Sequence, residues 1–201
     1  MPQPSSRVLQ FKIALKHTKP PIWRRILVPK EYSFWDLHVA IQDAMGWFDS
    51  HLHEFEIHNP RKGTIDRIGL PGDGFWDDAE VRCGWDVGIA GLFSSTNPKA
   101  TYTYDFGDNW EHSILLEKTL PRDPKRQYPC CTGGRRRCPP EDCGGPWGYL
   151  RFLEAVADPE HPEHQEMIEW FGGKFDPADF DAQGVVFDDP KKRLEFVMGV
   201  G

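Results

Sequence analysis

Apolar and polar residues alternate in five segments of the chain, with the period of two that is typical of half-buried strands. These segments span residues 8–17, 22–28, 51–58, 101–106 and 110–117. The last two are separated by Gly107 and Asp108, residue types that favour a tight turn, so they are predicted to form a hairpin. We expect all five strands to lie in one sheet.

One segment between the second and third strands has the period of an α-helix instead. Ser33 and Asp36 form a capping-box pattern at its start, apolar residues follow at helical spacing from Phe34 to Met45, and Gly46 closes it. This helix is predicted to cover the sheet. Two strands, a helix and a third strand give the chain a β-grasp-like start (ββαβ).

The remaining segments are predicted from their turn residues and their helical periodicity. Residues 59–78 are rich in Pro, Gly and Asp and are expected to form a long loop with at most a short strand. Helical patterns follow the hairpin at about residues 146–158, 162–171 and 188–198. The predicted fold class is therefore α+β, with a single mixed sheet of about five strands and a mostly helical C-terminal half.

Length and composition limit the number of domains and the location of the protein. A chain of 201 residues with 39% hydrophobic content can bury one core, so we expect a single domain over residues 1–201, with residues 1–6 disordered. The sequence has neither a secretory-signal pattern nor an apolar run of about 18 residues. Its five cysteines are an odd number. These features predict a soluble, cytoplasmic protein with reduced thiols.

The charge of the chain opposes a broad contact with phosphates. Its net charge is −7, so nonspecific DNA binding is not expected. A local anion site remains open, with candidates Arg24, Arg25, Arg135, Arg136 and Arg137. Such a site requires these arginines to share one surface. The alternative is that they form salt bridges within the protein.

A cysteine-rich loop after the hairpin is a candidate zinc site. Cys131, Cys138 and Cys143 provide three thiolates in a turn-rich segment, which suits a tetrahedral cation, with His112 or His53 as a fourth ligand. The spacing C-x6-C-x4-C differs from the usual C-x2-C pattern. The alternative is a metal-free loop held by its own prolines and glycines.

Five motifs give the chain a resemblance to a known family. They are PPIWRR, AIQDAMGW-x-x-SHLHEF, YDFGDNWEH, CPPEDCGG and GYLRFLEAVADPEHPEH. Together they resemble the plasmid pRiA4b open-reading-frame-three (ORF-three) family, which includes an accessory protein of an insertion element, from about residue 11 to residue 180. The resemblance implies a small α+β domain and gives little information on activity.

Two functional hypotheses from different classes follow. We favour a soluble binding or interaction module with an unknown protein or nucleic-acid partner, linked to plasmid or transposable-element biology, over an enzyme. The alternative is a metal-dependent hydrolase or nuclease, whose site would lie where the third strand meets the hairpin. Its candidate residues are His51, His53, Asp105, Asp108 and His112. An enzyme requires these side chains to converge on one cleft, whereas a binding module does not.

Overall fold

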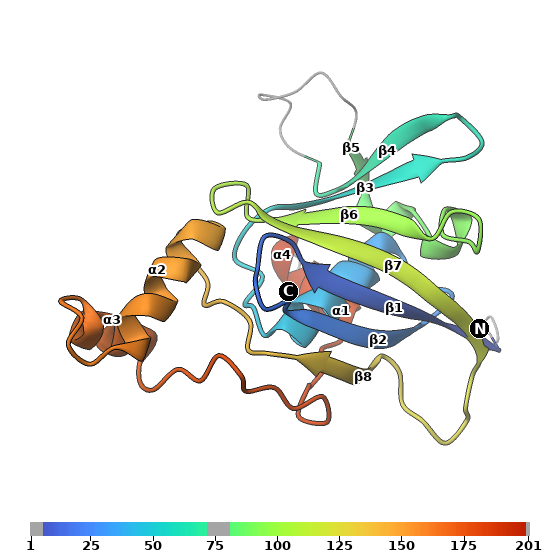
Figure 1. Ribbon diagram of the computed structural model, residues 1–201. Coiled ribbons are helices and arrows are strands. Elements are labelled where there is room, and N and C mark those ends of the chain that lie inside the picture. The colour runs from blue at the N-terminus through green and yellow to red at the C-terminus, as the bar shows by residue number, and fades with distance from the viewer. Residues whose placement is uncertain (1–5, 72–80, 200–201) are drawn as a thin grey trace.

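One curved sheet of eight strands organises the protein (Figure 1), and the computed structural model describes residues 6–71 and 81–199. The strands are β1 (Arg7–Leu15), β2 (Trp23–Pro29), β3 (His53–Asn59), β4 (Thr64–Gly69), β5 (Val81–Cys83), β6 (Lys99–Tyr104), β7 (Trp110–Pro121) and β8 (Cys130–Arg135). Their order in the sheet is β5-β4-β3-β6-β7-β1-β2-β8. All neighbours are antiparallel except β4 and β5, which are parallel.

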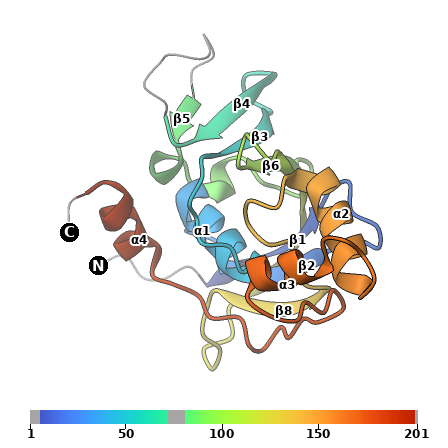
Figure 2. The same ribbon diagram turned by 90° about the vertical axis from the view of Figure 1, so that its left-hand side faces the viewer.

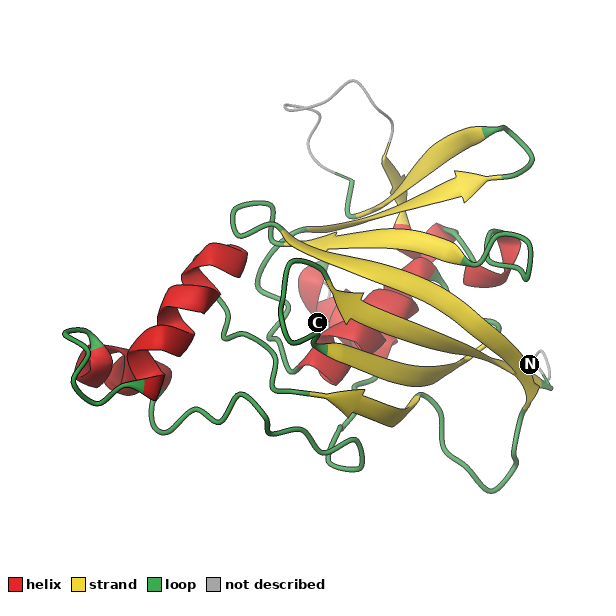
Figure 3. Ribbon diagram, in the orientation of Figure 1, coloured by secondary structure: helices red, strands yellow, loops and turns green. Residues whose placement is uncertain are grey.

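Four helices accompany the sheet: α1 (Phe34–Met45), α2 (Gly145–Ala157), α3 (His164–Phe171) and α4 (Pro190–Val197). Helix α1 lies in the hollow of the curved sheet, whereas α2 and α3 lie beyond one of its ends (Figure 3). None of the helices in the described part of the chain is long and apolar enough to cross a membrane.

The predicted helix over residues 34–45 is confirmed, with both of its ends. The Ser33 hydroxyl accepts the Asp36 N–H at 3.1 Å, and the Asp36 carboxylate accepts the Ser33 N–H at 2.8 Å. Gly46 ends the helix in the left-handed conformation, with a φ of 87°. Phe34 is fully buried and packs edge-to-face on Phe55 of the sheet at a centroid distance of 5.1 Å.

The five predicted strands all belong to the sheet, but the prediction of a sheet of about five strands is wrong. Strands β4, β5 and β8 complete it to eight. The β-grasp-like start is not formed either, because β7 and β6 separate β1 from β3. Strand β4 lies in segment 59–78, for which a loop with at most a short strand is predicted, and residues 72–78 of that segment are outside the described residues.

Strands β4 and β8 depart from the binary pattern for identifiable reasons. In β4 the apolar Ile65 is 57% exposed while Asp66 is buried, because the Asp66 carboxylate accepts hydrogen bonds from Asn59 and Arg82. In β8 the sequence CCTGGR has no alternation. A Cβ on Gly134 would lie 2.3 Å from the Phe180 ring, so the absent side chain leaves room for this ring.

The prediction of a mostly helical C-terminal half is wrong as well. Strands β6, β7 and β8 occupy much of it, and residues 172–189 contain neither helix nor strand. This segment returns past β8 to α1, where α4 docks (Figure 2). There the Trp35 indole N–H donates to the Pro190 carbonyl at 2.8 Å. Of the N-terminal residues predicted to be disordered, 1–5 lie outside the described residues.

Candidate functional site

Three loops converge at the end of the sheet that faces α2: residues 46–52, the turn 105–109 and residues 136–144. The Trp47 indole N–H donates to the Pro139 carbonyl at 2.9 Å. One oxygen of Glu141 accepts both the Phe48 N–H and the Tyr104 hydroxyl, each at 2.8 Å. These bonds join residues about 40 to 90 positions apart and hold the loops in fixed positions.

The turn between β6 and β7 is held by its own side chains. Asp105 adopts a φ of 55°, and its carboxylate accepts the Gly107 N–H at 2.9 Å. The Asp108 carboxylate accepts the Gly144 N–H at 3.1 Å, which ties the turn to the start of α2. A Cβ on Gly145, whose φ is 67°, would lie 2.3 Å from the Asp108 carbonyl oxygen. The contact between turn and helix therefore requires glycine.

Replacing Gly145 by alanine is expected to lower the free energy of unfolding by about 3 kcal/mol, from left-handed strain together with the clash on Asp108. Gly172→Ala is the matched control, because Gly172 has a similar φ of 83° but a Cβ added to it would meet nothing within 4 Å. This control is expected to cost about 1 kcal/mol, from the backbone strain alone. Urea unfolding measures both, and equal costs would contradict tight packing at Gly145.

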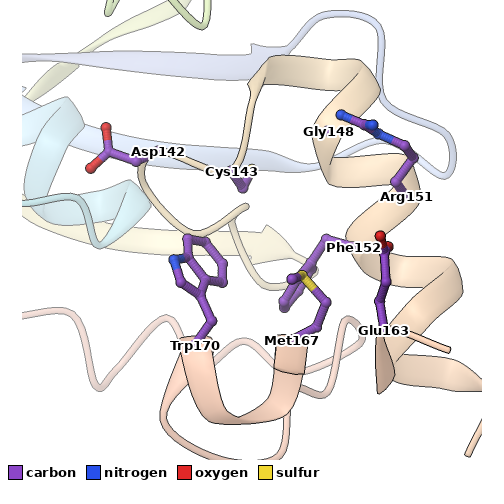
Figure 4. A pocket seen from close by; sticks show the side chains of 8 residues that line it. All are labelled: Asp142, Cys143, Gly148, Arg151, Phe152, Glu163, Met167 and Trp170. Atoms are coloured by element: carbon purple, nitrogen blue, oxygen red, sulfur yellow. The ribbon is translucent and has the colours of Figure 1, made fainter. Parts of the chain in front are cut away.

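Two adjoining hollows lie beside these loops and share Asp142 and Trp170. One, of about 300 Å³, lies between α2 and α3 (Figure 4), and the other, of about 580 Å³, lies beside the end of α1. Together we call them the Trp170 groove. Its walls include Trp47, Phe48, Arg137, Glu141, Asp142, Arg151, Phe152, Glu163, Met167, Trp170 and Phe171.

The Trp170 groove has exposed aromatic rings in its walls. Phe48 is 83% exposed and Trp170 is 47% exposed, so two large apolar surfaces face solvent there. In Figure 4 Trp170 of α3 extends toward the loop that carries Asp142 and Cys143. Exposed aromatic rings beside a hollow are typical of surfaces that bind another molecule.

Carboxylates outnumber cations along the Trp170 groove. Glu141, Asp142 and Glu163 line it, together with Arg137 and Arg151. The Arg137 guanidinium already lies over an aromatic ring of the protein, 5.0 Å from the ring centroid. The lining therefore combines aromatic rings with an excess of one negative charge.

His51 stands beside the groove with two carboxylates. Its Nε2 lies 2.9 Å from an oxygen of Asp142 and 3.6 Å from an oxygen of Asp105. Of the five residues predicted for a hydrolase or nuclease, only His51 and Asp105 come together. Asp108 is used to hold the turn, and His53 and His112 point into the core.

His112 is fully buried, and its Nδ1–H donates to the Tyr102 carbonyl at 3.3 Å. Burial lowers the pKa of His112 to about 4. The ring is therefore neutral at pH 7. It packs on Trp47 and Tyr102, with centroid distances of 5.3 and 5.2 Å, which places it beneath the converging loops rather than in the groove.

A second group of histidines is buried under the 46–52 loop. His38 of α1 contacts Asp49 at 2.8 Å through Nε2 and the Tyr102 hydroxyl at 2.9 Å through Nδ1. The His53 ring stacks on His38 with centroids 3.4 Å apart. Burial lowers the pKa of both histidines and raises the pKa of Asp49 to about 6. The sequence hypotheses include His53 but neither His38 nor Asp49.

The cysteines do not gather into such a group. In the described residues, two sets of three or more His, Cys, Asp or Glu side chains place their ligand atoms within 4.8 Å of one another: His38, Asp49 and His53, and His51, Asp105 and Asp142. Burial raises the pKa of Cys138 and of Cys143 to about 12, so both are protonated thiols at pH 7. Zinc at Cys131, Cys138, Cys143 and His112 stays a prediction.

The five candidate arginines do not share one surface. Arg24 is 1% exposed and points into the protein, whereas Arg25 pairs with Glu117 at 2.7 Å. Arg135 is exposed at the end of β8, Arg136 lies beside the β1–β2 turn, and Arg137 lines the Trp170 groove.

Residues 7–184 match the family described as "Plasmid pRiA4b ORF-3-like protein". The chain belongs to this family. It is 38% identical over 189 residues to the uncharacterized protein y4hQ of Sinorhizobium fredii (strain NBRC 101917 / NGR234), covering 94% of this chain and 91% of y4hQ. The crystal structure of MM3350, a protein of unknown function from Methanosarcina mazei Go1, is similar with a TM-score of 0.84. Its sequence is 46% identical, and the match covers 90% of this chain and 98% of MM3350.

Family membership confirms the resemblance drawn from the motifs, and the names of these relatives state no activity. Three of the five motifs of this pRiA4b ORF-3-like protein contribute residues to the Trp170 groove, within residues 40–55, 138–145 and 148–164. A fourth, at 104–112, supports it through the hydrogen bond from Tyr104 to Glu141. Trp170 itself follows the last motif. The one signal for it in the sequence is a large aromatic residue next to Phe171 near the end of the predicted helix.

Proposed function

We propose that this pRiA4b ORF-3-like protein is a protein-interaction module, and that the Trp170 groove binds a short peptide segment with basic and apolar side chains. The observation that carries the proposal is the pair of adjoining hollows on either side of Trp170, whose indole is 47% exposed. The family description refers to a plasmid, which supports a partner from plasmid or transposable-element systems.

The shape of the groove supports a peptide as the occupant. Hollows of about 300 and 580 Å³ are large enough for single side chains, and the indole between them is a ridge against which a backbone can lie. The hydrogen bonds from Trp47, Phe48 and Tyr104 hold one wall in place. A preformed site loses little conformational entropy on binding, which favours affinity.

The charge of the groove supports basic side chains in the partner. Glu141, Asp142 and Glu163 offer carboxylates, and an exposed indole attracts a cation above its face. The net charge of −7 attracts a cationic segment at long range and repels nucleic-acid phosphates. A basic peptide therefore fits this surface better than nucleic acid.

Selection from a display library of random short peptides tests this function. Peptides rich in Lys, Arg and apolar residues are expected, and a synthetic copy of the best binder serves as the probe. Trp170→Ala should weaken its binding by about 2 kcal/mol, roughly 30-fold, as expected for a central aromatic residue. Fluorescence anisotropy with the labelled peptide measures the affinity.

Trp147→Ala is the matched control for this prediction. Trp147 is 80% exposed on α2 but does not line either hollow, so its loss should leave the affinity within about twofold. Asp142→Asn tests the charge and should weaken basic peptides while preserving the fold. Selection of acidic peptides, or equal effects of the two tryptophan substitutions, would contradict the proposal.

A further inference from the structure

We infer that His38, Asp49 and His53 form a buried site for one divalent transition-metal cation, with Zn²⁺ as the best fit. The three ligand atoms lie within 4.8 Å of one another. They come from α1, the 46–52 loop and β3, so the fold brings them together from separate elements. Two imidazoles and one carboxylate are a ligand set that zinc accepts in proteins. This site is distinct from the Trp170 groove and from the cysteines.

The unpaired atoms of the cluster provide a second, independent observation. His53 is 2% exposed, and neither of its ring nitrogens has a hydrogen-bond partner among the described residues. One carboxylate oxygen of Asp49 is likewise buried and lacks a hydrogen bond within the described part of the chain. Buried polar atoms without partners carry a free-energy penalty, and they point to an ion or a water in the native protein. A cation would satisfy a ring nitrogen and the carboxylate together.

Hydrogen bonds within the protein satisfy the buried ring nitrogens of His38 but not those of His53. His38 contacts Asp49 at 2.8 Å and Tyr102 at 2.9 Å, so a structural role accounts for both of its nitrogens. The nitrogens of His53 have no hydrogen-bond partner among the described residues, and its ring lies parallel to that of His38, with an interplanar angle of 7° and centroids 3.4 Å apart. Because a metal lies in the plane of an imidazole that binds it, one of the two rings has to turn when both bind the cation. A metal that binds Nε2 of His38 leaves Nδ1–H free to donate to the Tyr102 hydroxyl, the outer contact that metal-binding histidines usually make.

The surroundings of the site suit a bound cation. The Trp35 ring lies 5.1 Å from His38 and 5.9 Å from His53, measured between centroids, which gives the site an apolar wall. The Asp49 oxygen without a hydrogen bond, Oδ2, lies 3.9 Å from Arg193 Nη1, so a bound cation would share this carboxylate with the guanidinium. Three protein ligands leave the fourth tetrahedral position for water.

Metal titration of the full chain tests the inference. Protein purified without an affinity tag is stripped with a chelator, and ZnCl₂ is then added while the ring nitrogens of ¹⁵N-labelled histidine are followed by NMR. We expect saturation at one equivalent, with His38 and His53 as the two of the eight histidines whose ring signals change directly. Zinc should also raise the melting temperature. Saturation without changes at these two rings would overturn the inference, as would the absence of binding.

Variants separate this site from the other candidates. His53→Asn and Asp49→Asn should each weaken zinc binding at least about 100-fold, with circular dichroism as the check on folding. His51→Asn and Cys138→Ser remove a member of the exposed His/Asp group and of the cysteine loop, and should retain the bound equivalent. Loss of zinc only in Cys138→Ser or in His51→Asn would assign the metal elsewhere and contradict the inference. The wild-type NMR titration decides the question if a ligand variant fails to fold.

Discussion

Replacing Arg24 by methionine is expected to lower the free energy of unfolding by about 4 kcal/mol. Arg24 is 1% exposed, and its guanidinium donates to the carbonyls of Ala44 at 2.7 Å, Trp23 at 2.9 Å and Arg135 at 3.2 Å. Methionine fills much of the same volume but leaves these acceptors without a donor. The guanidinium also lies 3.7 Å from the Phe180 ring centroid, so the C-terminal segment loses a contact as well.

Arg25→Met is the matched control for this substitution. Arg25 is the next residue in the same strand, but it lies on the opposite face and forms a partly exposed pair with Glu117 at 2.7 Å. Loss of such a pair is expected to cost about 1 kcal/mol or less. Urea unfolding of both variants measures the difference. Similar costs at the two positions would contradict the structural role assigned to Arg24.

Acidification from pH 6.5 to pH 4 is expected to destabilise the native protein by about 3 kcal/mol through His112 alone. Burial lowers the pKa of His112 in the folded state to about 4, below the ordinary value near 6.5. The unfolded state therefore takes up the proton first as the pH falls. Stability decreases through this window and levels off below about pH 4. The nearby charge of Lys16 acts on this pKa in the same direction as burial.

A comparison of wild type with His112→Gln isolates this contribution. The free energy of unfolding is measured at pH 7 and pH 5 for both proteins, at constant ionic strength. The variant starts from a lower stability because a buried hydrogen bond changes, but it should lose less on acidification than wild type does. The other buried histidines shift wild type and variant alike. An unchanged pH dependence in the variant would show that His112 does not remain neutral in the folded protein.

The sequence predicts those helices and strands whose limits are set by residues close together in the chain. The capping box of Ser33 and Asp36 defines the start of α1, and alternation identifies the hairpin of β6 and β7. Alternation does not identify strand β4, because its polar residue Asp66 is buried through hydrogen bonds from Asn59 and Arg82 in other segments. Alternation does not identify strand β8 either, because Gly134 has no side chain and leaves room for the ring of Phe180 from the C-terminal segment.

Only part of the candidate site can likewise be predicted from local patterns in the sequence. The concentration of turn residues and cysteines in residues 102–145 draws attention to one wall of the Trp170 groove. The other wall depends on contacts that no local pattern encodes, such as the bond between Phe48 and Glu141, 93 positions apart. Trp170 becomes a candidate only when α3 is placed beside its neighbours, and His38 of α1 only when β3 brings His53 against it.

The indole N–H signals of the eight tryptophans offer the most direct test of the proposed peptide site. A ¹⁵N-labelled sample is titrated with the basic peptide obtained by display, and the Trp170 signal is assigned by its loss in Trp170→Ala. Binding in the groove predicts that the signals of Trp170 and Trp47 move with the peptide concentration while that of the exposed Trp147 stays in place. A Trp170 signal that does not move at saturating peptide, or a shift confined to Trp147, would contradict the account.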